Sequence, residues 1–398
     1  MPGSFRIAGL FAGIGGIETG FRRALGDHLE TVLLCESWGP AQQVLKARFP
    51  EVEIHEDVAT LRDLPAQVDL VAAGFPCTDL SQAGRMAGIH GEESGLVAHL
   101  FDVLRLVSSR GDRLPWLLIE NVPNMLALER GEAMAYLVKE LDSLGYRWAY
   151  RVVDSRFTGV PQRRRRVLLL ASPTEDPRTV LFADDSAGLD ENGLHDDSFG
   201  FYWTEGRGGL GWARDATPTF KGGSAVGIPS PPAVWLPGEQ PGRKIVIPCV
   251  EDGEALQGFE RGWTKAADLG RRSGPRWKLV GNAVTVGVAQ WAAERILSPG
   301  VFDRSSTEWV RKGAWPTAAW GEGGKIWKVD VSEFPRLAPY THLRDLLDVD
   351  RASPLSHRAS SGFWRRLQEG NLGRHPGFRA DIAEHVDLAT TVSMAVAV

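Results

Sequence analysis

Short apolar runs, most of them closed by glycine, proline or an acidic residue, recur through the amino-terminal part of the chain. Such runs are typical of buried strands, and they predict strands over residues 5–10, 31–35, 68–73, 114–119, 150–154 and 166–171. Residues 18–25 and 285–297 have the pattern of helices instead. Strands alternating with helices predict an α/β fold, in which ligands bind at the carboxyl ends of the strands.

The pattern weakens in the middle of the chain. Residues from about 173 to 245 are rich in Gly, Pro, Ser and Asp, with Trp203, Trp212 and Trp235 scattered among short predicted strands. Beyond about residue 299 the chain mixes Trp, Pro and charged residues, and a helix is predicted near residues 362–367. Three roles stay open for this tail: a recognition extension, a partner surface or a structural buttress.

Composition narrows the class of protein. With 43% hydrophobic and 24% charged residues, the 398-residue chain can bury a large core in two or three structural units. No apolar run approaches the roughly 20 residues that span a bilayer, so we expect a cytoplasmic protein without membrane contact. Cys35, Cys77 and Cys249 are too few for a disulfide framework and lack metal-ligand spacing, so we expect no metal.

The net charge of −5 is unfavourable for binding a polyanion. The acidic residues cluster, however, in Asp184-Asp185, Asp190-Glu191 and Asp196-Asp197, whereas residues 163–166 and 203–244 lean basic. We expect the acidic clusters to face solvent, which leaves room for a locally positive cleft elsewhere.

The most informative loop follows the predicted strand over residues 68–73, and its sequence is Gly74-Phe75-Pro76-Cys77-Thr78-Asp79-Leu80-Ser81-Gln82. A strand end at the carboxyl edge of a sheet presents Cys77 to a cleft. A free thiol has a pKa near about 8.5, so this cysteine needs a cation, a helix amino terminus or a base to react at neutral pH. A buried structural thiol is the alternative.

A glycine turn, Ala12 to Gly16, separates the first predicted strand from the first predicted helix. Glycines let the backbone approach a ligand closely, and the helix amino terminus offers free N–H groups. Such a turn fits a nucleotide cofactor, a methyl donor or a plain turn. About twenty residues on, Glu36 ends a second strand, where a carboxylate can accept hydrogen bonds from ribose hydroxyls.

A series of blocks in this chain resembles, in order, those of the cytosine-5 DNA methyltransferases. Besides the Pro76-Cys77 loop, the blocks are Leu10-Phe11-Ala12-Gly13-Ile14-Gly15-Gly16, Glu36 with Trp38, Asp57-Val58, Ile119-Glu120-Asn121-Val122, Gly159-Val160-Pro161-Gln162-Arg163-Arg164-Arg165-Arg166-Val167, Leu256-Gln257-Gly258-Phe259 and Gly281-Asn282-Ala283-Val284. They cover roughly residues 5–172 and 245–298.

The resemblance implies a Rossmann-like methyltransferase fold that depends on S-adenosylmethionine, with a mostly parallel sheet and a smaller, loop-rich target-recognition domain. It divides the chain into a catalytic and cofactor-binding domain (1–172), a target-recognition domain (173–279), a helix returning to the catalytic domain (280–298) and a carboxyl-terminal extension of unknown role (299–398). The predicted helix over residues 285–297 would pack beside the glycine turn.

S-adenosylmethionine is the cofactor that the resemblance implies. Trp38 would stack on adenine, and Asp57 would read the adenine amino group. Many members of the family carry an acidic residue before the position of Leu10, where this chain has Gly9. The residues that the resemblance implies for cofactor binding are Phe11, Ala12, Gly13, Ile14, Gly15, Gly16, Glu36, Trp38, Asp57, Val58, Gly74, Pro76, Asn282 and Ala283.

The implied chemistry begins with attack of Cys77 on carbon 6 of a cytosine that has been flipped out of the double helix. Glu120, as a carboxyl group with a raised pKa, would protonate nitrogen 3 or donate a hydrogen bond to it, and Asn121 would orient the loop. Arg164 would hold the base carbonyl. Alternation places Gln162 and Arg166 on the same face of a strand as Arg164. Water would serve as the base that removes the proton from carbon 5.

Double-stranded DNA is the expected substrate, with Ser81, Gln82 and Arg85 on a closing loop and Lys221 in the target-recognition domain. Arg207, Arg214 and Arg243 are further candidates for contacts with phosphates or bases. We expect a monomer that is either paired with a separate restriction endonuclease or solitary.

Three alternatives remain. The tRNA-directed branch of the superfamily characteristically carries Cys-Phe-Thr, which no cysteine here begins. A catalytically silent DNA-binding relative would not need Cys77, Glu120 and Arg164. A nicotinamide-dependent oxidoreductase explains the glycine turn alone.

Overall fold

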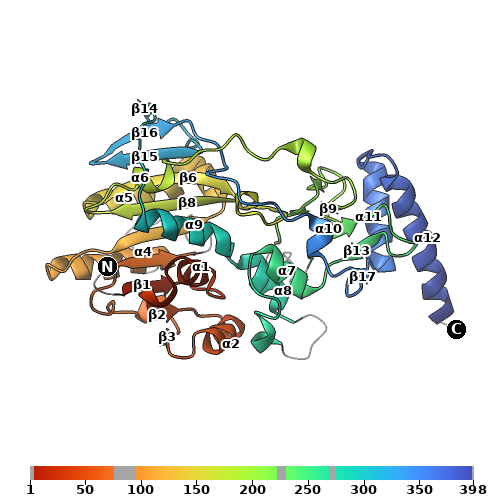
Figure 1. Cartoon of the computed structure of the whole chain (residues 1–398), viewed down its shortest axis with the longest axis horizontal. Coiled ribbons are helices and arrows are strands. Elements are labelled where there is room, and N and C mark those ends of the chain that lie inside the picture. Colours follow the sequence, from red (N-terminus) through yellow and green to blue (C-terminus); the bar gives the residue numbers. More distant parts are fainter. Residues whose placement is uncertain (1–3, 76–94, 222–229, 269–273, 397–398) are drawn as a thin grey trace. The chain divides into compact units, whose positions relative to one another are not determined.

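The computed structural model describes residues 4–75, 95–221, 230–268 and 274–396 (Figure 1). The chain folds into two compact units, each assembled from segments that are distant in the sequence. Unit 1 comprises Met1–Phe157, Arg165–Gly188 and Ala283–Leu337. Unit 2 comprises Thr158–Arg164, Leu189–Asn282 and Ala338–Val398. The segment predicted as one extension, residues 299–398, is therefore shared between the two units.

Unit 1 is built on a ten-stranded sheet in the order β14-β16-β15-β6-β8-β5-β4-β1-β2-β3. Its strands are β1 (Phe5–Leu10), β2 (Leu29–Cys35), β3 (Ile54–His55), β4 (Leu70–Ala73), β5 (Trp116–Asn121), β6 (Arg147–Asp154), β8 (Arg165–Ser172), β14 (Ser306–Glu308), β15 (Ala318–Glu322) and β16 (Lys325–Val329). Its helices are α1 (Gly16–Leu25), α2 (Gly39–Arg48), α4 (Leu96–Ser109), α5 (Glu132–Ser143), α6 (Arg178–Leu181) and α9 (Val286–Leu297), with short 3₁₀ turns between several of them.

The prediction of a mostly parallel sheet is correct for one half of this sheet only. Strands β3, β2, β1, β4 and β5 pair in parallel, whereas β5 pairs antiparallel with β8 and every pairing beyond β8 is antiparallel. For two of these antiparallel pairs the reason lies in the connection: a parallel pair needs a crossover of a dozen or more residues, and the links from β6 to β8 and from β15 to β16 are shorter.

Side chains of successive strand residues enter two different cores, as the pleat requires. Ala8 and Leu10 pack with the buried faces of α4 and α5, including Phe101 and Leu137. Ile7 lies on the opposite face and packs with α1, α6 and α9, including Phe21. Because both faces of the central strands are covered, these strands read as continuous apolar runs in the sequence.

Helix α9, which covers the helix predicted over residues 285–297, packs against α1, the helix that follows the glycine turn (Figure 1). The close approach depends on Gly20. A Cβ at this position would lie 2.5 Å from the Ala289 Cβ, 2.6 Å from the Gln290 nitrogen and 2.6 Å from the Val286 oxygen. Two of these atoms are backbone, so α9 would have to move as a whole.

Gly20→Ala should therefore lower the free energy of unfolding by about 1–3 kcal/mol, the usual cost of overpacking. Gly39→Ala is the matched control, because Gly39 is also helical but has no described atom within 4 Å of the position of an added Cβ. Urea unfolding monitored by circular dichroism compares the two variants. Equal stability of both would contradict the close packing of α1 on α9.

Unit 2 contains a five-stranded antiparallel sheet in the order β10-β9-β12-β13-β17 and a two-stranded sheet of β7 and β11. The strands are β7 (Gln162–Arg163), β9 (Phe199–Phe201), β10 (Ala213–Arg214), β11 (Thr217–Pro218), β12 (Ala233–Trp235), β13 (Ile245–Ile247) and β17 (Ser353–Pro354). The helices are α7 (Val250–Leu256), α8 (Arg276–Asn282), α10 (Leu343–Leu346), α11 (His357–Glu369) and α12 (Phe378–Val396). Within the described ranges of both units, no helix has the length and apolar character needed to cross a membrane.

The tail supplies half of the buried residues of the aromatic core cluster in unit 2. Phe363 on α11 and Phe378 on α12 lie 5.2 Å and 5.1 Å, between ring centroids, from Phe201 on β9. Trp235 on β12 joins the same buried cluster. Of the three roles left open for the tail, a structural buttress fits residues 338–398, because without them this sheet would expose its aromatic face to water.

One prediction about charge is only partly correct. Asp184 is half-buried and pairs with Arg295, and Asp185, although exposed, accepts a hydrogen bond of 2.6 Å from the fully buried Arg151. Removing one partner of a buried ion pair leaves an uncompensated charge, so these acids are structural. Asp190, Glu191, Asp196 and Asp197 are exposed, as predicted.

Candidate active site

Three strands of unit 1 end at the same edge of the sheet. Leu10 on β1 is paired with Ala73 on β4, and Ala73 is paired with Ile119 on β5. Glu120 and Asn121 therefore stand next to the start of the loop that carries Cys77. The Asn121 side-chain amide donates a hydrogen bond of 3.0 Å to the Phe75 carbonyl, which ties the beginning of that loop to β5. Pro76, Cys77, Ser81, Gln82 and Arg85 lie outside the described residues.

Glu120 is buried, with 7% of its surface exposed, and its carboxylate lies 3.0 Å from the Arg166 Nε. The antiparallel pairing of β5 with β8 brings them together, since Glu120 stands opposite Leu168 and Arg166 is two residues before it. The carboxylate is thus held in one orientation by a cation that is itself 12% exposed. The sequence predicted both residues as catalytic but not their ion pair.

The run from Gln162 to Arg166 is not one continuous strand, so the prediction that these side chains share a strand face is wrong. Gln162 lies on β7, which pairs with β11, whereas Arg166 lies on β8 of the large sheet. Arg164 falls between the two strands, and the boundary between the units follows it. A change of sheet partner redirects the backbone, which simple alternation cannot anticipate.

Gln162 and Arg164 are fully buried in unit 2, where three of the sequence blocks meet. Gln162 donates to the Leu256 carbonyl at 3.3 Å, and Arg164 donates to the Gly281 carbonyl at 3.2 Å. Gln257 donates to the Val280 carbonyl at 3.0 Å. These bonds give the Leu256–Phe259 block a structural role that the sequence did not reveal.

The glycine turn is joined to the end of β2 through Glu36. The Gly13 and Trp38 backbone N–H groups each donate a hydrogen bond of 2.8 Å to a different oxygen of the Glu36 carboxylate. Burial raises the pKa of Glu36, and these N–H donors oppose the shift. Gly15 has a φ of 79° and packs against the Phe49 ring, so only glycine fits there.

The other predicted cofactor residues differ in burial and in their position relative to this turn. Asp57 is exposed and caps a 3₁₀ turn by accepting from the Ala59 N–H at 2.9 Å, and Val58 is buried beside it. A Cβ on Gly74 would lie 3.8 Å from the Phe11 oxygen and 4.0 Å from the Val284 Cγ2, so the first, cysteine and last blocks meet in unit 1. Ala283 is buried in this unit, while Asn282 is exposed and belongs to unit 2.

Neither described cysteine has the properties of a nucleophile. Burial raises the pKa of Cys35 to about 12 and that of Cys249 to about 11. A thiolate is the reactive form, so both thiols are inert at neutral pH.

A titratable residue that the sequence missed lies beneath the glycine turn. Glu18, in the first turn of α1, is 1% exposed, and burial raises its pKa to about 7 against the weaker opposing effects of backbone hydrogen bonding and of Arg22. Its Oε2 has no hydrogen-bond partner among the described residues. Helical periodicity marked this position only as part of an amphipathic helix.

Because the folded-state pKa of Glu18 is above its ordinary value of 4.5, the folded protein holds a proton that the unfolded chain has lost between these two pH values. Stability should fall as the pH rises from about 4.5 to about 7. Glu18→Gln removes this loss, so it should raise the free energy of unfolding by about 3 kcal/mol at pH 8 and have little effect at pH 4.5. Urea unfolding of the cofactor-free protein at both pH values measures the difference; parallel pH profiles would contradict the burial of a titrating carboxyl group.

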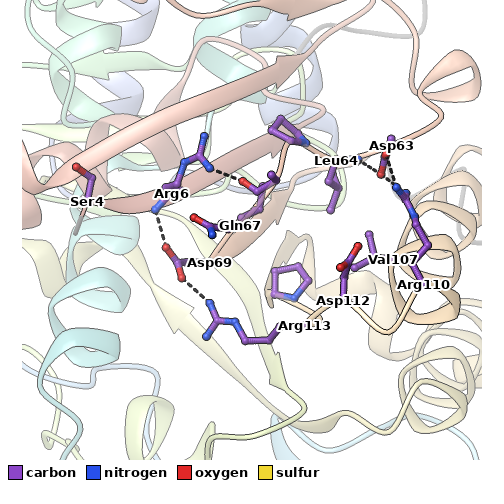
Figure 2. A pocket seen from close by; sticks show the side chains of 14 residues that line it. Ser4, Arg6, Asp63, Leu64, Gln67, Asp69, Val107, Arg110, Asp112 and Arg113 are labelled. Atoms are coloured by element: carbon purple, nitrogen blue, oxygen red, sulfur yellow. Dashed lines mark hydrogen bonds and ion pairs between the residues drawn. The ribbon is translucent and has the colours of Figure 1, made fainter. Parts of the chain in front are cut away.

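A cavity of about 660 Å³ lies at the opposite edge of the sheet, where β1, β4 and β5 begin (Figure 2). Four of its charged side chains form two pairs: Arg110 donates to Asp63 at 2.7 Å, and Arg113 contacts Asp69 at 2.5 Å. None of the predicted site residues that the structure describes lines it. The cavity is therefore not a candidate for the chemistry at the carboxyl edge.

The described cations that were predicted to contact DNA are held in ion pairs. Lys221 lies 2.5 Å from the Glu205 carboxylate and 3.9 Å from the centre of the Tyr202 ring. Arg207 pairs with Glu369, and Arg214 pairs with Asp196. Exposed pairs of this kind contribute about 0–1 kcal/mol, so a phosphate can replace the acid at little cost.

One cluster of unit 2, His195, Asp215 and His342, has ligand atoms close enough for a metal ion. The buried Asp215 carboxylate already accepts from the His342 Nδ1 at 2.6 Å and from the backbone N–H groups of His195 and Leu343. The two imidazole rings stack with centroids 3.5 Å apart and an angle of 5° between their planes. Nitrogen lone pairs of parallel rings do not converge on one ion, and we interpret the cluster as a hydrogen-bonded tie within unit 2.

Comparison with known proteins identifies the family. The model of the C-5 cytosine-specific DNA methylases matches residues 5–187. The chain is 47% identical to the type II methyltransferase M2.BsuMI of Bacillus subtilis over 370 residues, which cover 91% of this chain and 92% of that protein. It is 34% identical to M.BsuFI of Bacillus subtilis over 164 residues, or 40% of this chain and 37% of that protein.

Solved structures support the fold. The Schizosaccharomyces pombe Dnmt2 methyltransferase superposes with a TM-score of 0.54 at 16% identity, covering 74% of this chain and 99% of that one. The Entamoeba histolytica methyltransferase EhMeth gives 0.52 at 15% identity, with the same coverage. The mixed sheet of unit 1 is thus a methyltransferase sheet, and the chain belongs to the C-5 cytosine-specific DNA methylase family and is a DNA cytosine-5-methyltransferase.

Proposed function

We propose that this enzyme transfers a methyl group from S-adenosylmethionine to carbon 5 of cytosine within a specific sequence of double-stranded DNA. The observation that carries the proposal is the meeting of Glu120, Asn121 and the first residues of the Cys77 loop at the edge of the sheet where the glycine turn and Glu36 also lie. A nucleophile, an acid and a cofactor cradle on neighbouring strand ends are what methyl transfer to a cytosine ring requires.

The residues of the glycine turn fit the cofactor. No described atom lies within 4 Å of the position that a Cβ on Gly13 would take, so the turn has an open face. The partly buried Glu36 carboxylate can accept hydrogen bonds from the ribose hydroxyls. The half-buried Trp38 and the exposed Asp57 would bind adenine. S-adenosylmethionine, when bound, supplies an electrophilic methyl group.

Cys77 is the proposed nucleophile. Carbon 5 of cytosine is a weak nucleophile, and addition of the Cys77 thiolate at carbon 6 pushes electron density onto it. Glu120 donates a proton or a hydrogen bond to nitrogen 3 during this addition, and Arg166 keeps the carboxyl group oriented. After the methyl group has been added, a base removes the proton from carbon 5 and the thiolate leaves. Water is the proposed base.

The remaining predicted catalytic residues position the reacting groups. Asn121 holds the start of the Cys77 loop through the Phe75 carbonyl. Arg164 is the proposed partner of the cytosine carbonyl. Gln162 holds the chain just before Arg164 in place by donating a hydrogen bond to the Leu256 carbonyl. An arginine in a water-excluded pocket stabilises negative charge that develops on the ring.

Carbon 6 is hidden in a duplex, so the target base must leave the stack at a cost of a few kcal/mol. Ser81, Gln82 and Arg85 are the proposed contacts of the closing loop with DNA, and Lys221 is a proposed contact from the target-recognition segment. Relatives named type II methyltransferases suggest a modification enzyme, either paired with a separate restriction endonuclease or solitary. We infer a cytoplasmic monomer.

Bisulfite sequencing tests the reaction directly. Plasmid DNA is recovered from a bacterial host without cytosine methylation that expresses the full chain, and from the same host with an empty vector. Cytosines protected from conversion in one recurring sequence, with the full chain only, are expected and would also reveal the target. Complete conversion despite soluble protein would overturn the proposal.

A further inference from the structure

The Glu18 carboxyl group is an unusual feature of unit 1, because a buried carboxylate is ordinarily paired with a cation or fully hydrogen-bonded. Glu18 is 1% exposed, and its Oε2 has no hydrogen-bond partner among the described residues. Arg22, one turn further along the same helix, lowers the pKa of Glu18, but its effect is smaller than that of desolvation. The described part of the chain therefore leaves one oxygen of this group without a partner.

Gly9 makes the space that Glu18 occupies. A Cβ on Gly9 would overlap the Glu18 Oε1 and would lie 3.0 Å from its Cδ and 3.2 Å from the Leu34 Cδ2. Gly9 is next to the last residue of β1, and Glu18 is in the first turn of α1, so the two residues close the base of the glycine turn. The carboxyl group thus lies directly against the segment proposed to hold the cofactor.

The two acids near this turn differ in what they already bind. Glu36 accepts the Gly13 and Trp38 N–H groups through both of its oxygens. Glu18 keeps one acceptor oxygen that no described residue uses. A group with positive charge and several N–H donors would compensate both the charge and the missing hydrogen bond. The amino-acid end of S-adenosylmethionine carries such a group, its ammonium.

We infer that Glu18 binds the ammonium group at the amino-acid end of S-adenosylmethionine and that Gly9 is required to leave room for its carboxylate. This inference rests on the proposed function, which supplies the identity of the methyl donor. Glu18 acts in binding and takes no part in bond making, so its contribution appears in affinity.

Isothermal titration calorimetry of the full chain at pH 8 tests the inference with three probes. S-adenosylhomocysteine and 5′-methylthioadenosine share the adenosine and a neutral sulfur, and only the first has the amino-acid end. Glu18→Gln should weaken binding of S-adenosylmethionine and S-adenosylhomocysteine about tenfold or more, the value of a charge-assisted hydrogen bond. The affinity of this variant for methylthioadenosine should stay within about twofold of the wild-type affinity. Glu51→Gln, at an exposed acid, is the control and should change none of the three.

The other possible binding results would contradict either the role of Glu18 or the proposed function. Unchanged binding of all three probes, or equal weakening of all three, would overturn the role of Glu18. Weakening for S-adenosylmethionine alone would point to the sulfonium and would also overturn it. If the wild-type chain binds neither S-adenosylmethionine nor S-adenosylhomocysteine, the proposed function fails instead.

Gly9→Ala offers a second variant that leaves the glutamate in the sequence. Its Cβ would take the place of the Glu18 Oε1 and displace the carboxylate. The same selective loss for the two probes with an amino-acid end is expected. Wild-type affinity for S-adenosylhomocysteine in this variant would contradict the shared space.

Discussion

Replacing Cys77 by serine should abolish DNA methylation while leaving cofactor binding unchanged. A serine hydroxyl is a far weaker nucleophile than a thiolate, and loss of a covalent nucleophile commonly lowers turnover by about 10⁴-fold or more. Single-turnover transfer of a labelled methyl group to DNA measures the loss. The affinity for S-adenosylhomocysteine should stay within about twofold, because the proposed cofactor contacts do not include this thiol.

Cys249→Ser is the matched control, since burial raises the pKa of Cys249 to about 11 and its thiol is inert. This variant should keep wild-type turnover. A Cys77→Ser enzyme that methylates DNA at a rate near that of the wild type would remove the covalent step from the mechanism. Loss of activity in the Cys249→Ser enzyme as well would indicate damage to the fold.

Glu120→Gln should lower the rate of methyl transfer by about 10²–10⁴-fold, the range found for removal of a general acid or base. Glutamine has almost the same shape but cannot donate a carboxyl proton or pair with Arg166 as an ion. Single-turnover rates with saturating cofactor and DNA isolate the chemical step. The affinity for S-adenosylhomocysteine should again change little.

Glu333→Gln provides the comparison for this second variant. Glu333 pairs with Arg165, the neighbour of Arg166, and both of these side chains are more exposed than the Glu120 pair. The substitution removes a neighbouring, more exposed ion pair of β8 without changing the candidate site, and the rate should be that of the wild type. Similar losses in Glu120→Gln and Glu333→Gln would assign the effect to the stability of β8 and not to catalysis.

Much of the site could be predicted because its residues stand at the ends of buried strands. The strands predicted over residues 5–10, 68–73 and 114–119 correspond to β1, β4 and β5, with ends that differ by at most a few residues. Continuous apolar runs bounded by Gly, Pro or acidic residues are a strong signal for such strands. Glu36 and Glu120 therefore fall at the same carboxyl edge in the structure as in the prediction.

The missed features depend on contacts between distant segments. The path from Gln162 to Arg166 changes sheet partner at Arg164, which no local alternation records. Glu18 looks like an ordinary polar residue in a helix until the space beside Gly9 is seen. The division of residues 299–398 between two units follows from long-range packing of β15 on β6 and of α11 and α12 on β9 and β12.

The aromatic core of unit 2 also has a consequence for the order of events during protein synthesis. Phe199, Phe201 and Trp235 leave the ribosome well before Phe363 and Phe378, the residues that cover them. Domains generally fold as units during synthesis, and an apolar surface that stays exposed until later residues bury it is prone to aggregation. These aromatic residues cannot be buried until α11 and α12 have been synthesised, so we expect the nascent chain to be most prone to aggregation before its last segment leaves the ribosome.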